Sequence, residues 1–177
     1  MSASAIPPLV FRDCVGEFAT GVTVVIAELD GRPAGMTLNS FTSVSLDPLL
    51  VLVSLAHGSR TLHATAQSGR FTVSVLHRGQ AEVALDFAER GAPFPERHVG
   101  RRYHGNLAVT GAAAILACRV VGTTTAGDHD LVVGEVDEIE HGGGEPLVFY
   151  RGRFGGMQAD AVVPADRPIW LDEGSGW

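Results

Sequence analysis

The sequence predicts a mainly β protein with a few short helices, folded as a closed or nearly closed antiparallel barrel. Its 22 glycines and its many valines, threonines and serines favour strands joined by tight turns. The expected strands follow one another through turn signals rather than through regular helices, which argues against a doubly wound sheet. The length of 177 residues favours one domain with a substantial core.

The first part of the chain is expected to form a helix and a hairpin, followed by a buried strand. Apolar residues at helical spacing follow Pro7-Pro8 and predict a helix that ends near Gly21. Asp30-Gly31 lies between two strand-like runs and is a strong signal for a type I′ turn. The strands expected here cover residues 22–29, 32–40 and 49–55.

The rest of the chain shows two further helices and several strands. Ser59 can cap a short helix that Gly69 stops. A stretch with two prolines and little periodicity is interpreted as a long loop. The expected elements are helices over residues 59–68 and 80–89, the loop over 91–106, and strands over 71–75, 113–125, 131–140 and 147–150.

Composition and motifs exclude several classes of function. The formal net charge is -7 with no block of basic residues, which argues against nucleic acid as a partner. No apolar run reaches membrane-spanning length and the N-terminus lacks a signal-peptide pattern, so we expect a cytoplasmic protein with no membrane partner. Cys14 and Cys118 have no partner motif and are expected to be buried free thiols.

Two kinds of site have no motif in this sequence. There is no G-x-G-x-x-G after a strand and no P-loop, so a Rossmann or P-loop nucleotide site is not supported. Seven histidines are present, but none has the spacing of a metal-ligand pair, and we expect no metal site.

The stretch over residues 34–61 carries the densest functional signal. Hydroxyl and amide side chains precede a buried strand, an arrangement that suits a ligand with many oxygens and nitrogens. Ser59-Arg60-Thr61 then opens a helix, where free N–H groups and the helix dipole favour a phosphate. The alternative is an antiparallel sheet with a solvated Ser/Thr face and an ordinary N-cap at Ser59.

Several ordered motifs between Phe11 and Phe154 resemble one known family. The sequence is similar to the short-chain flavin reductases, the NAD(P)H:flavin oxidoreductase components of two-component monooxygenases. The motifs are Gly21-Val22-Thr23-Val24-Val25, Gly35-Met36-Thr37-Leu38-Asn39-Ser40-Phe41, Ser43-Val44-Ser45-Leu46-Asp47-Pro48, Ser59-Arg60-Thr61, Gly127-Asp128-His129 and Tyr150-Arg151-Gly152.

This resemblance implies a fold and an activity. The fold would be the FMN-binding split barrel, a Greek-key antiparallel β-barrel that works as a homodimer. It would occupy residues 1–156, followed by a C-terminal arm or tail at 157–177. The implied activity is transfer of a hydride from NADH or NADPH to N5 of FMN or FAD, with reduced flavin diffusing to a separate monooxygenase. The loop over residues 91–106 departs from the family pattern, so the choice between FMN and FAD stays open.

The resemblance also implies site residues. His129 would face the nicotinamide side of the flavin; the alternative is a plain turn in which Asp128 caps backbone N–H groups. Phe87 would line the flavin pocket, or it is an ordinary core residue of its helix. The other cofactor-binding residues would be Thr37, Leu38, Asn39 and Ser40 at the ring edge and ribityl chain, Ser54 and Ala56 beside the ribityl phosphate, and Ser59, Arg60 and Thr61 at the phosphate.

Two other functions remain open from the sequence. One is a non-catalytic flavin carrier or sensor on the same barrel, because a fold does not determine its function. The other is a structural β-barrel without a ligand.

Overall fold

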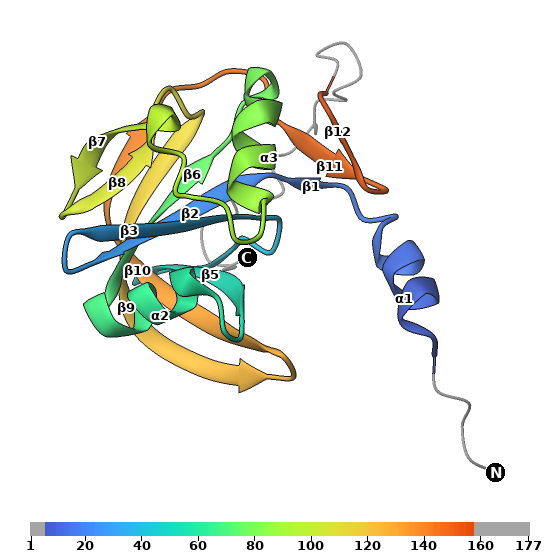
Figure 1. Cartoon of the computed structure of the whole chain (residues 1–177), viewed down its shortest axis with the longest axis horizontal. Helices are drawn as coiled ribbons and strands as arrows, with labels where there is room; N and C mark the ends of the chain where they lie inside the picture. The colour runs from blue at the N-terminus through green and yellow to red at the C-terminus, as the bar shows by residue number, and fades with distance from the viewer. Residues whose placement is uncertain (1–5, 158–177) are drawn as a thin grey trace.

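The structure is a computed structural model that describes residues 6–157 (Figure 1). The helical segments are α1 Pro8–Val15, α2 Arg60–Ser68 and α3 Ala81–Ala88, with the 3₁₀ turns η1 Arg78–Gln80 and η2 Glu96–His98. The strands are β1 Thr20–Gly21, β2 Thr23–Leu29, β3 Arg32–Leu38, β4 Thr42–Leu46, β5 Leu49–Ala56, β6 Arg70–Val75, β7 Val99–Tyr103, β8 Asn106–Val109, β9 Ala114–Ala126, β10 His129–His141, β11 Val148–Tyr150 and β12 Arg153–Gly155.

Seven of these strands form one antiparallel sheet in the order β3-β2-β6-β9-β10-β5-β4. Its two edges, β3 and β4, follow one another in the chain and are separated only by residues 39–41. Ser40 Oγ accepts a hydrogen bond from Ser54 N on β5 at 3.1 Å, which brings the end of β3 to the opposite side of the sheet. The first and last strands of the sheet therefore lie close together, which is possible only because the sheet curls into the expected barrel.

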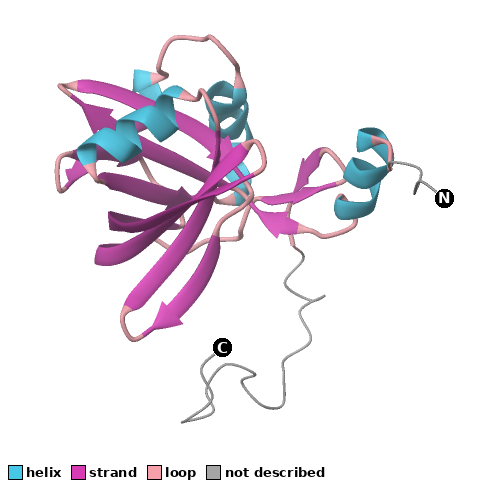
Figure 2. Cartoon of the chain, turned by 90° about the horizontal axis from the view of Figure 1, so that it is seen from below, coloured by secondary structure: helices cyan, strands magenta, loops and turns pink. Residues whose placement is uncertain are grey.

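Both faces of β2 are buried, because its side chains alternate between two core clusters. Val25 and Ala27 pack in one cluster with Leu62 of α2 against it. Val24 and Ile26 pack in the other, which includes residues of α3 and of the β7–β8 hairpin. Figure 2 shows α1 projecting away from the curled sheet. None of the helices in residues 6–157 is long and apolar enough to cross a membrane.

Turn and cap predictions are confirmed by the backbone. Asp30 and Gly31 have φ of 50° and 74°, the left-handed pair that a type I′ turn requires. The Ser59 side chain caps α2, and Gly69 ends it with φ of 68°.

The first helix is shorter than predicted. The α1 helix ends at Val15, because the next residues turn and Thr20 pairs with Phe149 of β11 instead. All its residues are exposed, including Cys14, so the prediction that both cysteines are buried is wrong for that one. Burial raises the pKa of the Cys118 thiol to about 12.

The loop predicted over residues 91–106 is also wrong in part. Its second half forms β7, which pairs with β8. Groups far away in the sequence hold this hairpin: Thr72 Oγ1 donates to Leu107 O at 2.6 Å, and the backbone Glu28 N donates to Asn106 Oδ1 of the hairpin at 2.7 Å. Short strands β4 and β12 were not predicted. The predicted arm at 157–177 lies outside the described residues except for Met157.

A close contact in the core gives a first prediction. A Cβ at Gly134 would lie 2.5 Å from Phe71 Cζ and 3.0 Å from Cys118 Cβ. Gly134→Ala should therefore lower the free energy of unfolding by about 1–3 kcal/mol, measured by chemical denaturation. Gly122→Ala on the neighbouring strand is the control, because its Cβ would meet nothing nearer than 3.9 Å. Equal stability of the two variants would contradict the packing described here.

Candidate functional site

A cavity of about 490 Å³ lies where the end of β5, the start of α2 and the end of α3 meet β3. The short segment after α3, including Gly91, forms another of its walls. Six of the predicted site residues line it: Thr37, Ala56, Ser59, Arg60, Thr61 and Phe87. Residues from three separate parts of the sequence are therefore brought to one cavity.

The start of α2 offers hydrogen-bond donors to this cavity. Ser59 Oγ accepts from Leu62 N at 3.1 Å and so satisfies one donor of the first turn. The N–H groups of Arg60 and Thr61 have no backbone partner in the described part of the chain. Free N–H groups together with the helix dipole make this helix start suitable for an anion.

The β3 side of the cavity is shaped by a close contact with Phe87. A Cβ at Gly35 would lie 2.7 Å from Phe87 Cε1, so only glycine lets the ring pack on this strand. Phe87 is almost fully buried and meets Phe94 edge-on, with ring centroids 5.5 Å apart. It is therefore both a core residue and a wall of the cavity.

His129 starts β10, directly after the tight turn that joins it to β9. The strand register pairs it with Ala56, which lines the cavity. Its Nδ1 lies 2.7 Å from Asp128 Oδ1, and this hydrogen bond lowers the pKa of the Asp128 carboxyl. When Nδ1–H donates to the carboxylate, Nε2 is left as an acceptor in the neutral ring. The side chain is 40% exposed, so an incoming ligand can reach it.

Comparison with known proteins identifies the family. Residues 15–158 match the family model of the flavin reductase like domain. The chain belongs to this family. It is 42% identical over 161 residues to the reductase component of 4-nitrophenol 4-monooxygenase/4-nitrocatechol 2-monooxygenase from Rhodococcus opacus, a match that covers 90% of this chain and 84% of the relative.

Two further similarities agree with the assignment to the flavin reductases. An NADH-dependent flavin reductase from a Rhodococcus species is 42% identical over 157 residues, covering 86% of this chain and 88% of that protein. The structure of the Streptomyces globisporus NADH:FAD oxidoreductase SgcE6, in complex with NAD and FAD fragments, matches with a TM-score of 0.83 and 34% identity. That match covers 90% of this chain and 100% of the solved chain.

Within this flavin reductase, the residues predicted on either side of Ser40 lie in different surroundings. The Leu38 side chain is buried in the core, so it can meet a ligand only through its backbone. Asn39 is exposed and lines a different cavity, beside α1. Ser40 and Ser54 hydrogen-bond to one another and hold the sheet edges together. Their roles at the flavin stay predictions.

Arg60 makes a contact that the sequence did not indicate. Its Nη2 donates to Ala92 O at 2.9 Å, across the cavity from α2. The guanidinium therefore ties the segment after α3 to the start of α2. A phosphate at this helix start would compete with Ala92 for the same donors.

His57 is the main residue of the cavity that sequence reasoning missed. Its Nε2 lies 2.8 Å from Asp130 Oδ1, which also accepts from Thr125 Oγ1 at 2.8 Å. The hydrogen bond from His57 is the main cause of a lowered pKa at Asp130. Its position between Ala56 and the Gly-Ser turn was the available signal, but only the strand register brings it next to Asp130.

One acidic cluster lies outside the cavity. Ligand atoms of Glu82, Asp86 and His98 lie within 4.8 Å of one another. Arg97 Nη2 already donates to Asp86 Oδ2 at 2.5 Å, so this cluster is paired with a cation of the chain. The sequence prediction that no metal site exists stays a prediction.

Proposed function

We propose that this flavin reductase transfers a hydride from NADH or NADPH to FMN or FAD and releases the reduced flavin to a separate monooxygenase. The observation that carries the proposal is the cavity at the start of α2, with free N–H groups of Arg60 and Thr61 at its wall. Family membership over residues 15–158 supports the same activity.

The donors around the cavity fit the two ends of a flavin nucleotide. The start of α2 suits the phosphate. At the other end, β3 is an edge strand, so backbone N–H groups on its outer side have no sheet partner and can donate to the ring edge. The Thr37 hydroxyl already donates to Ala84 O at 2.7 Å, so residues 37–40 would act mainly through their backbone.

When bound, the flavin supplies the redox chemistry by accepting a hydride at N5. The chain then needs neither a nucleophile nor paired acids. Its residues bind the phosphate, orient the ring against Phe87 and exclude water from the buried side of the cavity. His129 Nε2 is free to accept a hydrogen bond from the nicotinamide carboxamide or ribose, because Asp128 holds Nδ1.

The names of relatives support a particular donor and partner. The Rhodococcus relative described as an NADH-dependent flavin reductase supports NADH as the donor. The Rhodococcus opacus relative is a monooxygenase reductase component, which supports a monooxygenase reached by diffusing reduced flavin. We assign the reaction to the cytoplasm, where reduced nicotinamide dinucleotides are produced.

A non-catalytic flavin carrier would bind flavin without oxidising NADH, so a steady-state assay varying FMN, FAD, NADH and NADPH separates the two functions.

We also propose that the protein is a homodimer. The α1 helix projects from the barrel and buries none of its residues against it (Figures 1 and 2). Leu9, Phe11 and Phe18 are 71%, 59% and 76% exposed. Such a group of large apolar side chains on one arm is typical of a surface that a second copy covers.

The phosphate assignment predicts a ligand-specific effect of Arg60→Ala. FMN binding should weaken by about 1.5–3 kcal/mol, the range for a hydrogen bond to a charged group. Riboflavin lacks the phosphate and should bind the variant as it binds the parent protein. Fluorescence titrations with both ligands measure this. Equal losses would mean that Arg60 acts by holding Ala92, and would remove the phosphate assignment.

The nicotinamide assignment predicts that His129→Ala harms reduction and spares flavin binding. One lost orienting contact should slow reduction, or raise the NADH requirement, about tenfold. Stopped-flow reduction at several NADH concentrations and a flavin titration of the same variant measure the two effects. His141→Ala, at the exposed far end of the same strand, is the control. Unchanged reduction with a loss of flavin binding would make His129 a flavin or structural residue.

The dimer proposal predicts the mass of the protein in solution. Light scattering at micromolar concentration should give twice the chain mass of 18.6 kDa. Phe18→Glu should yield monomers, because it buries a charge in the interface. Leu85→Glu, at an apolar residue of α3 that is 59% exposed, should leave the dimer intact. A fully active monomer for the parent protein would refute the proposal.

A further inference from the structure

The β9–β10 turn that leads into His129 lies beyond the paired parts of its strands. The pairing of β10 with β5 ends at His129 opposite Ala56, and its pairing with β9 ends at His129 opposite Ala126. Residues 123–128 are all exposed, and the Asp128 side chain is 94% exposed. Packing therefore contributes little to the position of this turn, which depends on hydrogen bonds from its neighbours.

His57, the residue that follows β5, makes two such contacts. Its backbone N donates to Asp128 O at 2.9 Å. Its side-chain Nε2 lies 2.8 Å from Asp130 Oδ1. The two contacts fall on the residue directly before His129 and on the residue directly after it. A displacement of the His129 backbone relative to β5 would therefore strain or break at least one of them.

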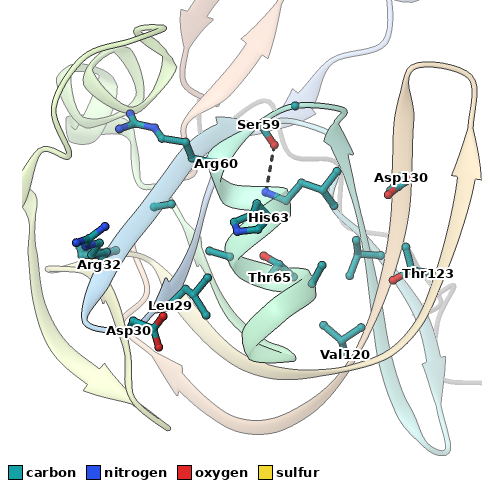
Figure 3. Close-up of a pocket in the computed structure, with 17 residues that line it drawn as sticks. Leu29, Asp30, Arg32, Ser59, Arg60, His63, Thr65, Val120, Thr123 and Asp130 are labelled. Carbon is teal, nitrogen blue, oxygen red and sulfur yellow. Dashed lines mark hydrogen bonds between the residues drawn. The ribbon is translucent and has the colours of Figure 1, made fainter.

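The contact between His57 and Asp130 has a defined donor. Asp130 lies on the β9–β10 hairpin and shares a cavity with residues of α2 (Figure 3). Its Oδ1 also accepts a hydrogen bond from Thr125 Oγ1 at 2.8 Å. Hydrogen bonding to His57 first, and to Thr125 second, lowers the pKa of the Asp130 carboxyl, so this group is ionised at neutral pH. Nε2 of His57 therefore carries the hydrogen, and the carboxylate fixes the orientation of the ring.

We propose that His57 is a positioning residue for hydride transfer, because it fixes the turn that carries His129; this inference rests on the proposed reduction of flavin. The contact assigned to His129 is sensitive to geometry, since a misplacement of about 1 Å can slow a reaction about 100-fold. The His57 side chain is 43% exposed, so its ion pair adds little to stability. Its loss should therefore affect reduction of the flavin much more than folding.

The test is a double-mutant cycle on the rate of flavin reduction, measured by stopped flow at several NADH concentrations. His57→Ala should slow reduction, or raise the NADH requirement, about tenfold and leave flavin affinity unchanged. In the His129→Ala background the same change should have almost no further effect, because the side chain that it positions is gone. Losses that multiply to about 100-fold would mean that His57 acts independently of His129, and would overturn the inference.

Two conservative variants and a matched control separate positioning from a general effect on structure. His57→Gln places an amide donor at the reach of Nε2 and should restore reduction to within about twofold of the parent rate, whereas the shorter His57→Asn should not. His104→Ala is the control, because His104 is 42% exposed and its Nε2 lies 3.5 Å from a carboxylate oxygen of Glu138. This variant should reduce flavin at the parent rate.

Asp130→Ala removes the same contact from its other side, and it serves as the test if His57→Ala does not fold. It should slow reduction about as much as His57→Ala, and the two changes together should slow it no more than either alone. Reduction at the parent rate in both variants, or in His129→Ala, overturns the inference but leaves the reductase proposal standing. A parent protein that oxidises no NADH in the presence of flavin overturns both.

Discussion

The pairing of β5 with β10 is the constraint on which the candidate site depends. It runs in register from His129 opposite Ala56 to Glu135 opposite Leu50. The end of β5 leads directly into α2, so this pairing brings the helix start and the β9–β10 turn to the same end of the barrel. A slip of one residue would exchange the two faces of β10 and move His129 to the face that Asp130 and Val132 now occupy. The buried Val132 opposes such a slip, because it would be turned out of the core.

Side-chain contacts around the cavity add to the strand pairing of the sheet. His57 and Asp130 join the end of β5 to the start of β10 beside the turn, and Arg60 joins α2 to Ala92. Because these contacts are exposed, each contributes little to stability by itself. Their value is geometric: they hold the polar walls at fixed positions around a rigid core. The segment after α3 is tied by the Arg60 contact to the same helix start that we assign to the phosphate, so ligand binding there and the position of that wall are coupled.

Local signals in the sequence were sufficient to predict those turns and helix ends that are determined by residues a few positions apart. Asp30-Gly31 fixed a hairpin and Ser59 with Gly69 bounded a helix, because φ preferences and caps act within a few residues. The β7–β8 hairpin was missed because it is held by Thr72 and Asn106 through hydrogen bonds that join distant parts of the chain. For the same reason, neither the burial of Leu38 nor the pairing of His57 with Asp130 could be predicted. The capped helix start at Ser59-Arg60-Thr61 could be predicted, since its signal lies within three consecutive residues, whereas its role at a phosphate stays a prediction.

Electrostatics explains how an acidic chain can serve anionic cofactors. The net charge of -7 repels a flavin nucleotide at long range, so the affinity must come from short-range donors at the start of α2 and from arginines beside it. At physiological salt the repulsion is screened beyond about 8 Å, whereas contacts within a partly closed cavity are screened much less. Binding then depends on a few local hydrogen bonds rather than on a broad field of charge. Such a site can hold a flavin during reduction and still let it leave, which is what a reductase that supplies a separate oxygenase requires.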